Sequence, residues 1–208
     1  MKKILLIIVL ICLSGSFAQA IEENTQVTTP KFKKQNITIV PKSITEFELI
    51  DKNGHSKMVN LKGKDFIVVS VSEPGSEGKS YAVDKDGLIW WKDTISSGAY
   101  GGYETPSGIY PIILKRRYHM SGTHPSADGV NNMDFEMLFD NRGYALHLGN
   151  TKALSHGCIH IGRRDVEAMF KWVDKKTKVV IMRGSYGQFL KQEVDAYKKE
   201  IKSYNKKH

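Results

Sequence analysis

The chain has 208 residues, 31 lysines and arginines against 22 aspartates and glutamates, a formal net charge of +9 and two cysteines. Its hydrophobic content of 40% is enough for a buried core, which excludes general disorder. Two cysteines exclude a disulfide-dense miniprotein, and by themselves they exclude a four-cysteine zinc site. The positive charge leaves acidic partners open, namely nucleic acid, anionic lipid or an acidic wall polymer.

The first 20 residues are typical of a secretory signal peptide. Two lysines follow the initiator methionine and precede an unbroken apolar run over residues 4–13, and the segment ends in Ala-Gln-Ala. A transmembrane anchor is the alternative, but the apolar run is shorter than a membrane span. A lipid anchor on Cys12 would need a small residue before it, where Ile11 stands. We therefore expect cleavage after Ala20 and export without an integral membrane segment.

Cleavage would change both the charge and the cysteine count. The net charge falls to +7, and Cys158 is the single cysteine left. A lone thiol in an oxidising compartment has no intramolecular partner, so it is a buried bystander, an intermolecular link, a ligand or a nucleophile.

The elements that follow are mostly strands. Residues 21–42 are polar and basic and predict a flexible tether. Residues 44–50 and 57–61 flank an Asp-Lys-Asn-Gly turn, so residues 43–62 are expected to form an N-terminal β-hairpin segment. Further strands are predicted at residues 66–71, 80–83, 88–95, 109–114, 135–139, 144–148 and 178–182.

Two helices and one long loop complete the pattern. Residues 165–173 place apolar side chains on one face of a short helix, and residues 188–204 have a looser apolar face. Residues 116–132 are polar and rich in Gly, Ser, Pro and His, which predicts a long functional loop. The fold class is therefore mainly β with a few helices (α+β), ending in a lysine-rich helical segment over residues 186–208.

Most of the positive charge lies in the tether and in the C-terminal helix. A solvated lysine-rich helix accounts for the tail, and loose attraction to an acidic wall or lipid surface is the alternative. The chain has no nucleic-acid-binding motif, so no nucleic-acid partner is expected.

Chemically reactive residues gather in two short segments, one ending at His147 and the other the run Ser-His-Gly-Cys-Ile-His at residues 155–160. In the second segment His156 and His160 flank Cys158. A cysteine nucleophile needs a nearby base or cation, because only a few per cent of a free thiol is ionised at neutral pH.

An extended backbone would bring these groups together. On a strand His156, Cys158 and His160 share one face, and His147 arrives from the end of the preceding predicted strand. The backbone N–H groups of Gly157 and Cys158 would point at a developing oxyanion. The segment thus offers a nucleophile, a base and an oxyanion hole.

The same residues suit two other interpretations. His147, His156, Cys158 and His160 are all zinc-type ligands, so a zinc site stays open. A structural thiol with surface histidines stays open as well. Spacing alone does not decide among the three.

The sequence resembles the L,D-transpeptidase catalytic domain, also called the YkuD-like domain, from about residue 67 to residue 182. The run Ser-His-Gly-Cys-Ile, with an upstream His147 in an apolar-His-x-Gly setting, carries most of the resemblance. The turn Glu-Thr-Pro-Ser-Gly-Ile-Tyr at residues 104–110, after Ile-Ser-Ser-Gly at residues 95–98, adds to it. So does the strand pair that leads from Asn132 to His147.

The resemblance implies a mostly β catalytic domain, a β-sandwich or barrel over residues 63–185, that acts on peptidoglycan stem peptides. It implies that Cys158 attacks the bond between a third-position diamino acid and a terminal D-Ala, with His147 as general base. An amine acceptor would complete transpeptidation, and water would give an L,D-carboxypeptidase product. It implies no metal or organic cofactor, and a location in the periplasm or at the cell surface of a bacterium.

The same resemblance gives roles to the neighbours of the thiol. His156 would orient the site or help to hold the oxyanion, and Gly157 would contribute backbone. Ser155 would support the histidines by hydrogen bonding, with a plain turn serine as the alternative.

The chain departs from the family at His160, where Arg or Asn is usual, and His160 is then the candidate substrate contact. Arg163 or Arg164 is a candidate replacement, with a solvated helix start as the alternative. The predicted loop over residues 116–132 would lie as a lid over the cleft. Its candidate contacts are Tyr118, His119 and His124. A non-catalytic wall-binding protein with the same fold is the remaining alternative function.

Overall fold

The computed structural model describes residues 37–71, 77–99, 101–122 and 131–190, together with residues 192, 194, 195, 198, 199 and 202. The predicted signal peptide, most of the predicted tether and His124 lie outside the described residues. The described residues belong to one structural unit, Lys34–His208. None of their helices is long and apolar enough to cross a membrane.

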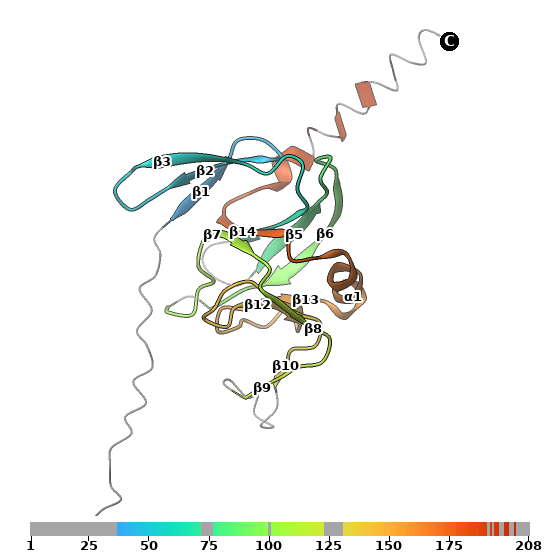
Figure 1. Ribbon diagram of the computed structural model, residues 1–208. Helices are drawn as coiled ribbons and strands as arrows, with labels where there is room; N and C mark the ends of the chain where they lie inside the picture. Colours follow the sequence, from blue (N-terminus) through green and yellow to red (C-terminus); the bar gives the residue numbers. More distant parts are fainter. Residues whose placement is uncertain are drawn as a thin grey trace, which may run out of the picture. The chain divides into compact units, whose positions relative to one another are not determined.

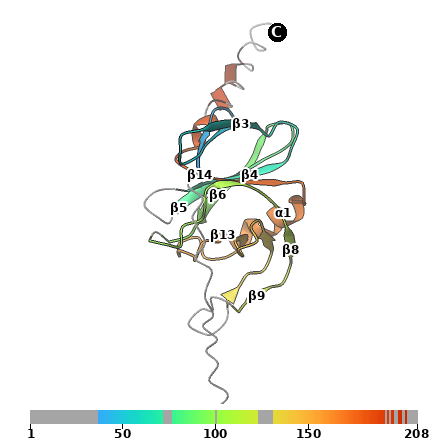
Figure 2. The ribbon, with the colours of Figure 1, turned by 60° about the vertical axis from the view of Figure 1, so that its left-hand side comes forward.

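A curled nine-stranded sheet forms the body of this unit (Figure 1, Figure 2). In chain order its strands are β4 (Phe66–Val71), β5 (Glu77–Val83), β6 (Ile89–Ser96), β7 (Gly108–Pro111), β8 (Leu114–Arg116), β11 (Glu136–Leu138), β12 (Ala145–Leu148), β13 (Ile159–Ile161) and β14 (Lys178–Arg183). Their order across the sheet is β7-β14-β4-β5-β6-β13-β12-β11-β8. β4 runs parallel to β14, and β12 runs parallel to β13. The predicted mainly β fold is confirmed.

The curl follows from how the chain joins the two edges of the sheet. β7 lies at one edge and β8 at the other, yet only Ile112 and Ile113 separate them. Because each residue spans at most about 3.6 Å, Pro111 and Leu114 lie within about 11 Å of each other. The two edges therefore approach each other and the sheet becomes a half-barrel. The sequence predicts one strand over residues 109–114. This is wrong, because the first half forms one edge of the sheet, paired with β14, and the second half begins the other edge, paired with β11.

The central strand β4 is buried on both faces. All six of its residues are buried, and alternate side chains enter two different hydrophobic cores. Ile67 and Val69 belong to the core that also holds the buried face of helix α1 (Arg163–Trp172). Phe66 and Val68 belong to the other core. Cover on both sides explains why this stretch of sequence is apolar without alternation.

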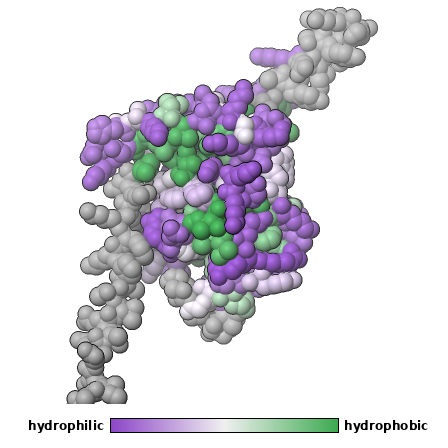
Figure 3. Space-filling model, viewed as in Figure 1, coloured by the Kyte–Doolittle hydropathy of each residue, from purple (hydrophilic) through white to green (hydrophobic). Residues whose placement is uncertain are grey.

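A three-stranded antiparallel sheet covers the second core. Its strands are β1 (Thr38–Pro41), β2 (Glu46–Ile50) and β3 (Ser56–Asn60). β2 and β3 form the predicted hairpin, whereas β1 lies where the sequence predicts a tether. Ile39 and Phe47 are buried, and the Phe47 ring meets the edge of Phe66 at 6.0 Å between centroids. Figure 3 shows hydrophobic residues gathered in this upper part of the view.

The described residues include two helical segments, as predicted. α1 buries Val166 and Met169, and it begins two residues before the predicted start. Residues 187–190 are helical, as are the other described residues of the C-terminal segment. Tyr186 and Phe189 close the second core at the start of that segment.

The predicted loop over residues 116–132 is a hairpin arm in its described part. The arm carries two short strands, β9 (Met120–Ser121) and β10 (Asn131–Asn132), which pair antiparallel. Below them the Met133 N–H donates to the His119 carbonyl at 2.8 Å. The sequence predicts a long functional loop here; its described part carries this short backbone ladder, which polar composition does not reveal. We call residues 117–122 and 131–135 the arm.

Candidate active site

Five polar residues stand in one row across adjacent strands. Arg116 on β8 lies opposite Glu136 on β11. His147 on β12 lies opposite His160 on β13, which in turn lies opposite Ser96 on β6. The register between β11 and β12, continued by one residue, places Glu136 beside His147. Directly opposite residues share a face of a sheet, so the five side chains form one polar row.

The other face of the same strands is apolar. The neighbours of the row in sequence alternate to the opposite side. They are buried in the core with α1, namely Ile95, Met137, Leu146, Ile159 and Ile161. The apolar face fixes the register, because a shift by one residue would bury the polar row in that core.

His147 is almost fully buried, with 2% of its surface exposed. Its Nδ1 lies 2.7 Å from the Leu148 carbonyl oxygen, which accepts a hydrogen bond only if Nδ1 carries the proton. The lone pair is then on Nε2. Burial, together with the nearby His160, lowers the pKa of His147 to about 4. The ring is therefore neutral at neutral pH and able to accept a proton.

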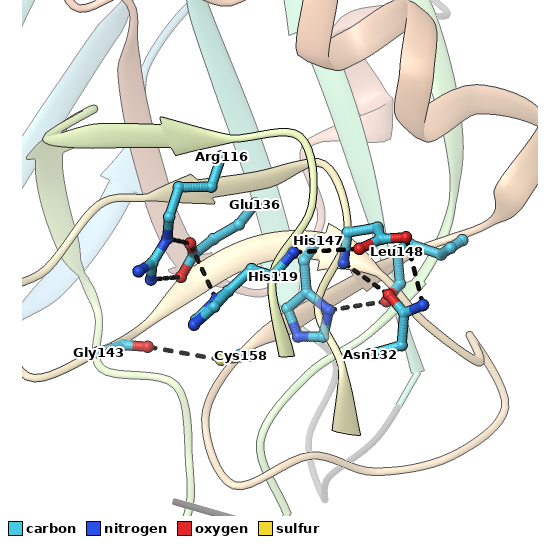
Figure 4. Close-up of polar contacts among 9 residues, drawn as sticks. Arg116, His119, Asn132, Glu136, Gly143, His147, Leu148 and Cys158 are labelled. Carbon is cyan, nitrogen blue, oxygen red and sulfur yellow. Dashed lines mark hydrogen bonds and ion pairs between the residues drawn. The ribbon is translucent and has the colours of Figure 1, made fainter. Parts of the chain in front are cut away.

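Cys158 lies directly before β13 and is half-buried. Its Sγ lies 3.7 Å from the Gly143 carbonyl oxygen. Burial raises the pKa of the thiol to about 11, and Glu136 adds to that increase. Figure 4 shows the thiol on the same side of the sheet as the rings of His119 and His147. The resting pair is thus a protonated thiol and a neutral imidazole.

The turn that presents Cys158 is held by its own polar groups. The Ser155 hydroxyl donates to the Cys158 carbonyl at 2.6 Å and accepts from the Gly157 N–H at 2.9 Å. The Thr105 hydroxyl donates to the Gly157 carbonyl at 2.9 Å. Ser155 is therefore a turn serine, and none of its hydrogen bonds among the described residues goes to a histidine.

Gly157 has a conformation that other residues avoid. Its φ is +119°, and a Cβ added there would lie 2.2 Å from Cε1 of Tyr144. The absence of a side chain lets the Tyr144 ring pack against the turn. Because the Gly157 N–H is bound to Ser155, it does not point at substrate in this structure, contrary to the expectation of an oxyanion donor.

The sequence predicts that His156 shares a strand face with Cys158 and His160, but the structure does not place it there. The strand begins only at Ile159, and the turn at Gly157 directs His156 to another side. There its ring meets the edge of Tyr103, with 4.6 Å between centroids.

His160 lies behind His147 and is held by the loop above it. Its Nδ1 lies 3.1 Å from the Asn150 carbonyl oxygen and 2.9 Å from the Ser96 hydroxyl. Its ring meets the edge of the His147 ring at 5.0 Å between centroids. Burial lowers the pKa of His160. The geometry gives it a supporting contact with His147 rather than a free surface for substrate.

The two outer candidates lie apart from this cluster. Arg163 is exposed at the first residue of α1. Tyr118 lies on the arm with 75% of its surface exposed, next to the Arg117 guanidinium. No contact between either residue and the row is seen in the described part of the chain.

Three polar residues of the site, Arg116, His119 and Glu136, were not assigned from the sequence as a group. Arg116 donates from Nε and Nη2 to both oxygens of Glu136, which is 1% exposed. Nδ1 of His119, on the arm, lies 3.1 Å from Oε2 of Glu136. Figure 4 shows the three side chains together beside Cys158. The signal was a single glutamate inside the apolar strand Phe-Glu-Met-Leu-Phe at residues 135–139.

The four residues of the zinc interpretation do not converge as ligands. Among the described residues no three His, Cys, Asp or Glu side chains are grouped to hold a metal ion. His156 packs on Tyr103, and the Nδ1 atoms of His147 and His160 lie against backbone carbonyls.

Comparison with known proteins gives one family. A search of curated proteins gave no match. Solved structures with a similar fold include L,D-transpeptidases from three organisms. The Enterococcus faecium enzyme is 19% identical, with a TM-score of 0.46, over 58% of this chain and 50% of that one. The Stackebrandtia nassauensis enzyme is 21% identical, with a TM-score of 0.45, over 61% of this chain and 60% of that one. The Mycobacterium smegmatis enzyme is 13% identical, with a TM-score of 0.47, over 74% of this chain and 80% of that one.

The chain thus spans 50% and 60% of the first two of these structures. A family model described as the L,D-transpeptidase catalytic domain (YkuD) matches residues 64–181, a range that runs from just before β4 into β14 and includes His147 and Cys158. Because this match covers more than half of the chain, the protein belongs to the L,D-transpeptidase catalytic domain family, whose members act on peptidoglycan peptides.

Proposed function

We propose that this protein is an exported cysteine L,D-transpeptidase, in which Cys158 is the nucleophile and His147 the general base. The observation that carries the proposal is the placement of His147 on β12 and of Cys158 directly before the adjacent parallel strand β13, on the same side of the sheet. The neutral His147 ring, with its lone pair on Nε2, is in the form that a base requires. The donor would be a tetrapeptide stem, cleaved between its diamino acid and terminal D-Ala.

In the acylation step the Cys158 thiol gives its proton to Nε2 of His147 as the sulfur attacks the scissile carbonyl carbon. The tetrahedral intermediate collapses, the C–N bond breaks, and the leaving D-Ala amine takes the proton back from His147. A thioester on Cys158 and free D-Ala result. Because the pKa of the thiol is raised to about 11, proton transfer and attack occur together rather than from a stored thiolate.

In the second step an amine attacks the thioester and loses a proton to His147, and the proton passes to the departing Cys158 sulfur. The acceptor amine would come from a second stem or a wall-linked protein. Water in its place would give the L,D-carboxypeptidase product. The oxyanion would be held by the Cys158 N–H, since the Gly157 N–H is bound to Ser155. His156 would act from the side of Tyr103, next to the incoming stem.

The rest of the chain fits delivery to the wall. Residues 1–20 would direct export and be removed, residues 21–37 would act as a basic tether, and the catalytic domain would cover residues 63–185. The basic C-terminal segment over residues 186–208 would favour an acidic wall surface. No metal or organic cofactor takes part in the proposed steps.

The test is incubation of the purified protein with a disaccharide-tetrapeptide, followed by intact-protein mass spectrometry and product analysis. We expect an acyl adduct on Cys158, release of D-Ala, and a cross-linked product only when an amine acceptor is added. Cys158→Ala should give neither adduct nor D-Ala, with an unchanged circular dichroism spectrum. D-Ala release by Cys158→Ala would refute the mechanism. Binding to isolated cell walls without any product would favour the non-catalytic alternative.

A further inference from the structure

We propose that Arg116 and His119, anchored by the buried Glu136, form a carboxylate-binding subsite beside Cys158. Its ligand would be the C-terminal carboxylate of the donor stem. This inference rests on the proposed function and names the part of the substrate that the charged cluster recognises.

The depth of Glu136 is the first argument. Burying a carboxylate to 1% exposure is strongly unfavourable unless it is paired. Arg116 supplies that pairing through both carboxylate oxygens. A buried ion pair is seldom more stable than an apolar pair of the same size, so stability alone does not account for it. Placing a guanidinium rigidly in a site does account for it.

The free ends of the two basic side chains are the second argument. Arg116 uses Nε and Nη2 on Glu136, and its side chain stays 40% exposed. Its Nη1 end has no partner among the described residues. His119 turns Nδ1 toward Glu136 and keeps 24% of its side chain exposed, so its Nε2 is directed elsewhere. Arg116 neutralises the charge of Glu136, so the pair does not repel an anionic ligand and the Nη1 end of the guanidinium is left to bind one.

The location of the cluster is the third argument. Glu136 stands in the polar row next to His147, and its charge adds to the rise that burial causes in the pKa of Cys158. In the view of Figure 4 the His119 ring lies next to the thiol, and the Arg116–Glu136 pair lies above that ring. In a tetrapeptide donor the terminal carboxyl carbon is two bonds from the nitrogen of the scissile amide. A group that binds this carboxylate must therefore lie next to the reacting sulfur, as this cluster does.

The backbone holds His119 in place. The His119 N–H donates to Asp134 Oδ1 at 3.1 Å, and the His119 carbonyl accepts from Met133 at 2.8 Å. Phe135, directly before Glu136, has a φ of +58°, a left-handed conformation that aromatic residues rarely adopt. The Arg117 guanidinium stacks over that ring at 4.6 Å from its centroid. Strain at this point is consistent with a site whose geometry is enforced.

The chemistry of the ligand follows from the donors. A planar guanidinium edge and a ring N–H of His119 match the two oxygens of a carboxylate. A stem that ends at the residue after the scissile bond presents a carboxylate there. A longer stem presents a neutral amide at the same point. The subsite would therefore select stems that end one residue past the cut.

The test compares two substrates on each protein, a tetrapeptide stem with a free terminal carboxylate and the same stem with a terminal carboxamide. For the wild type we expect kcat/KM for the acid to exceed that for the amide at least about 30-fold, the usual value of a charge-assisted pair. The double variant Arg116→Gln/Glu136→Gln removes both charges without leaving a buried carboxylate unpaired, and the ratio should fall below about 3. His119→Gln should lower the ratio about 5-fold to 10-fold.

His55→Gln is the matched control, because His55 is an exposed histidine in the turn between β2 and β3 whose Nδ1 also lies 3.2 Å from a carboxylate oxygen, that of Asp51. It should keep the wild-type ratio. Equal rates on acid and amide by the wild type, or an unchanged ratio in the double variant and in His119→Gln, would overturn the subsite while leaving the proposed function intact. If the double variant fails to fold, His119→Gln alone decides. Failure of the wild type to cleave either stem would instead overturn the proposed function.

Discussion

Strands β4 and β12 lie in the same sheet but have opposite environments. β4 carries apolar side chains to both faces, and each face meets a hydrophobic core. β12 buries Leu146 in one core and turns His147 to the polar row. The candidate chemistry therefore occurs where the sheet has an apolar layer on one side only. The apolar side fixes the strands, and the other side is free to carry groups that would destabilise a core.

The polar face is ordered because its buried groups have partners. Ser96 donates to the Ala153 carbonyl at 2.7 Å, His147 to the Leu148 carbonyl, and Arg116 to Glu136. Each partner offsets the cost of removing a polar atom from water. On β12 and β13, a substitution on the polar face should therefore lower mainly activity. A substitution on the apolar face should lower mainly the free energy of unfolding.

The largest effect is expected from His147→Asn on the polar face. Loss of the base should lower kcat/KM on a tetrapeptide donor by about 10³-fold, a typical contribution of general acid–base catalysis. The controls are His55→Asn, an exposed histidine in the turn between β2 and β3, and Ile159→Val on the apolar face. His55→Asn should keep wild-type activity. Ile159→Val should lower the free energy of unfolding by about 1 kcal/mol with little change in rate. The reverse pattern would contradict the assignment of the two faces.

The second effect is a loss of stability in acid. The pKa of His147 is about 4 in the folded protein, below the ordinary value of 6.5, because of burial and the nearby His160. Between these pH values the unfolded chain binds the extra proton, so the stabilisation is present above pH 6.5 and is lost as the pH falls to 4. The loss should be about 3 kcal/mol in urea unfolding at pH 4 compared with pH 7. The free energy of unfolding of His147→Asn should lack this part of the pH dependence. If the variant and the wild type lost the same stability between pH 7 and pH 4, the buried neutral ring would be ruled out.

The smallest effect compares two glycines with positive φ. Gly157→Ala must adopt a φ of +119° and displace the Tyr144 ring, whereas Gly54→Ala has a φ of +83° with nothing within 4 Å. Both substitutions should lower the free energy of unfolding by about 1 kcal/mol because of the backbone conformation. Only Gly157→Ala should lose about 2 kcal/mol more, because of the close contact with Tyr144. Thermal unfolding of the two variants measures the difference. Equal losses would show that the Tyr144 contact is relaxed without cost.

Local features were predictable, and relations between distant strands were not. The apolar run of β4, the hairpin of β2 and β3 and the amphipathic α1 have clear patterns, and Ser-His-Gly-Cys marked the segment around Cys158. The polar row depends on the register of five strands, which no single stretch of sequence encodes. Glu136 therefore looked like one odd residue in a strand. His156 was misplaced because the φ of Gly157 breaks the strand that its spacing suggested.

The position of β14 bears on how the domain is made. It is the last of the described strands in chain order, yet it lies between β7 and β4, and among the described strands it alone pairs with β7. A growing chain therefore keeps β7 unpaired and one side of β4 open until residue 183 has been synthesised. The pairing of β14 with β4, more than a hundred residues apart in sequence, forms slowly. A long loop must close before any contact between the two strands can stabilise the pair. The domain should stay unfolded, and able to pass through a narrow channel, for longer than a protein built from local hairpins.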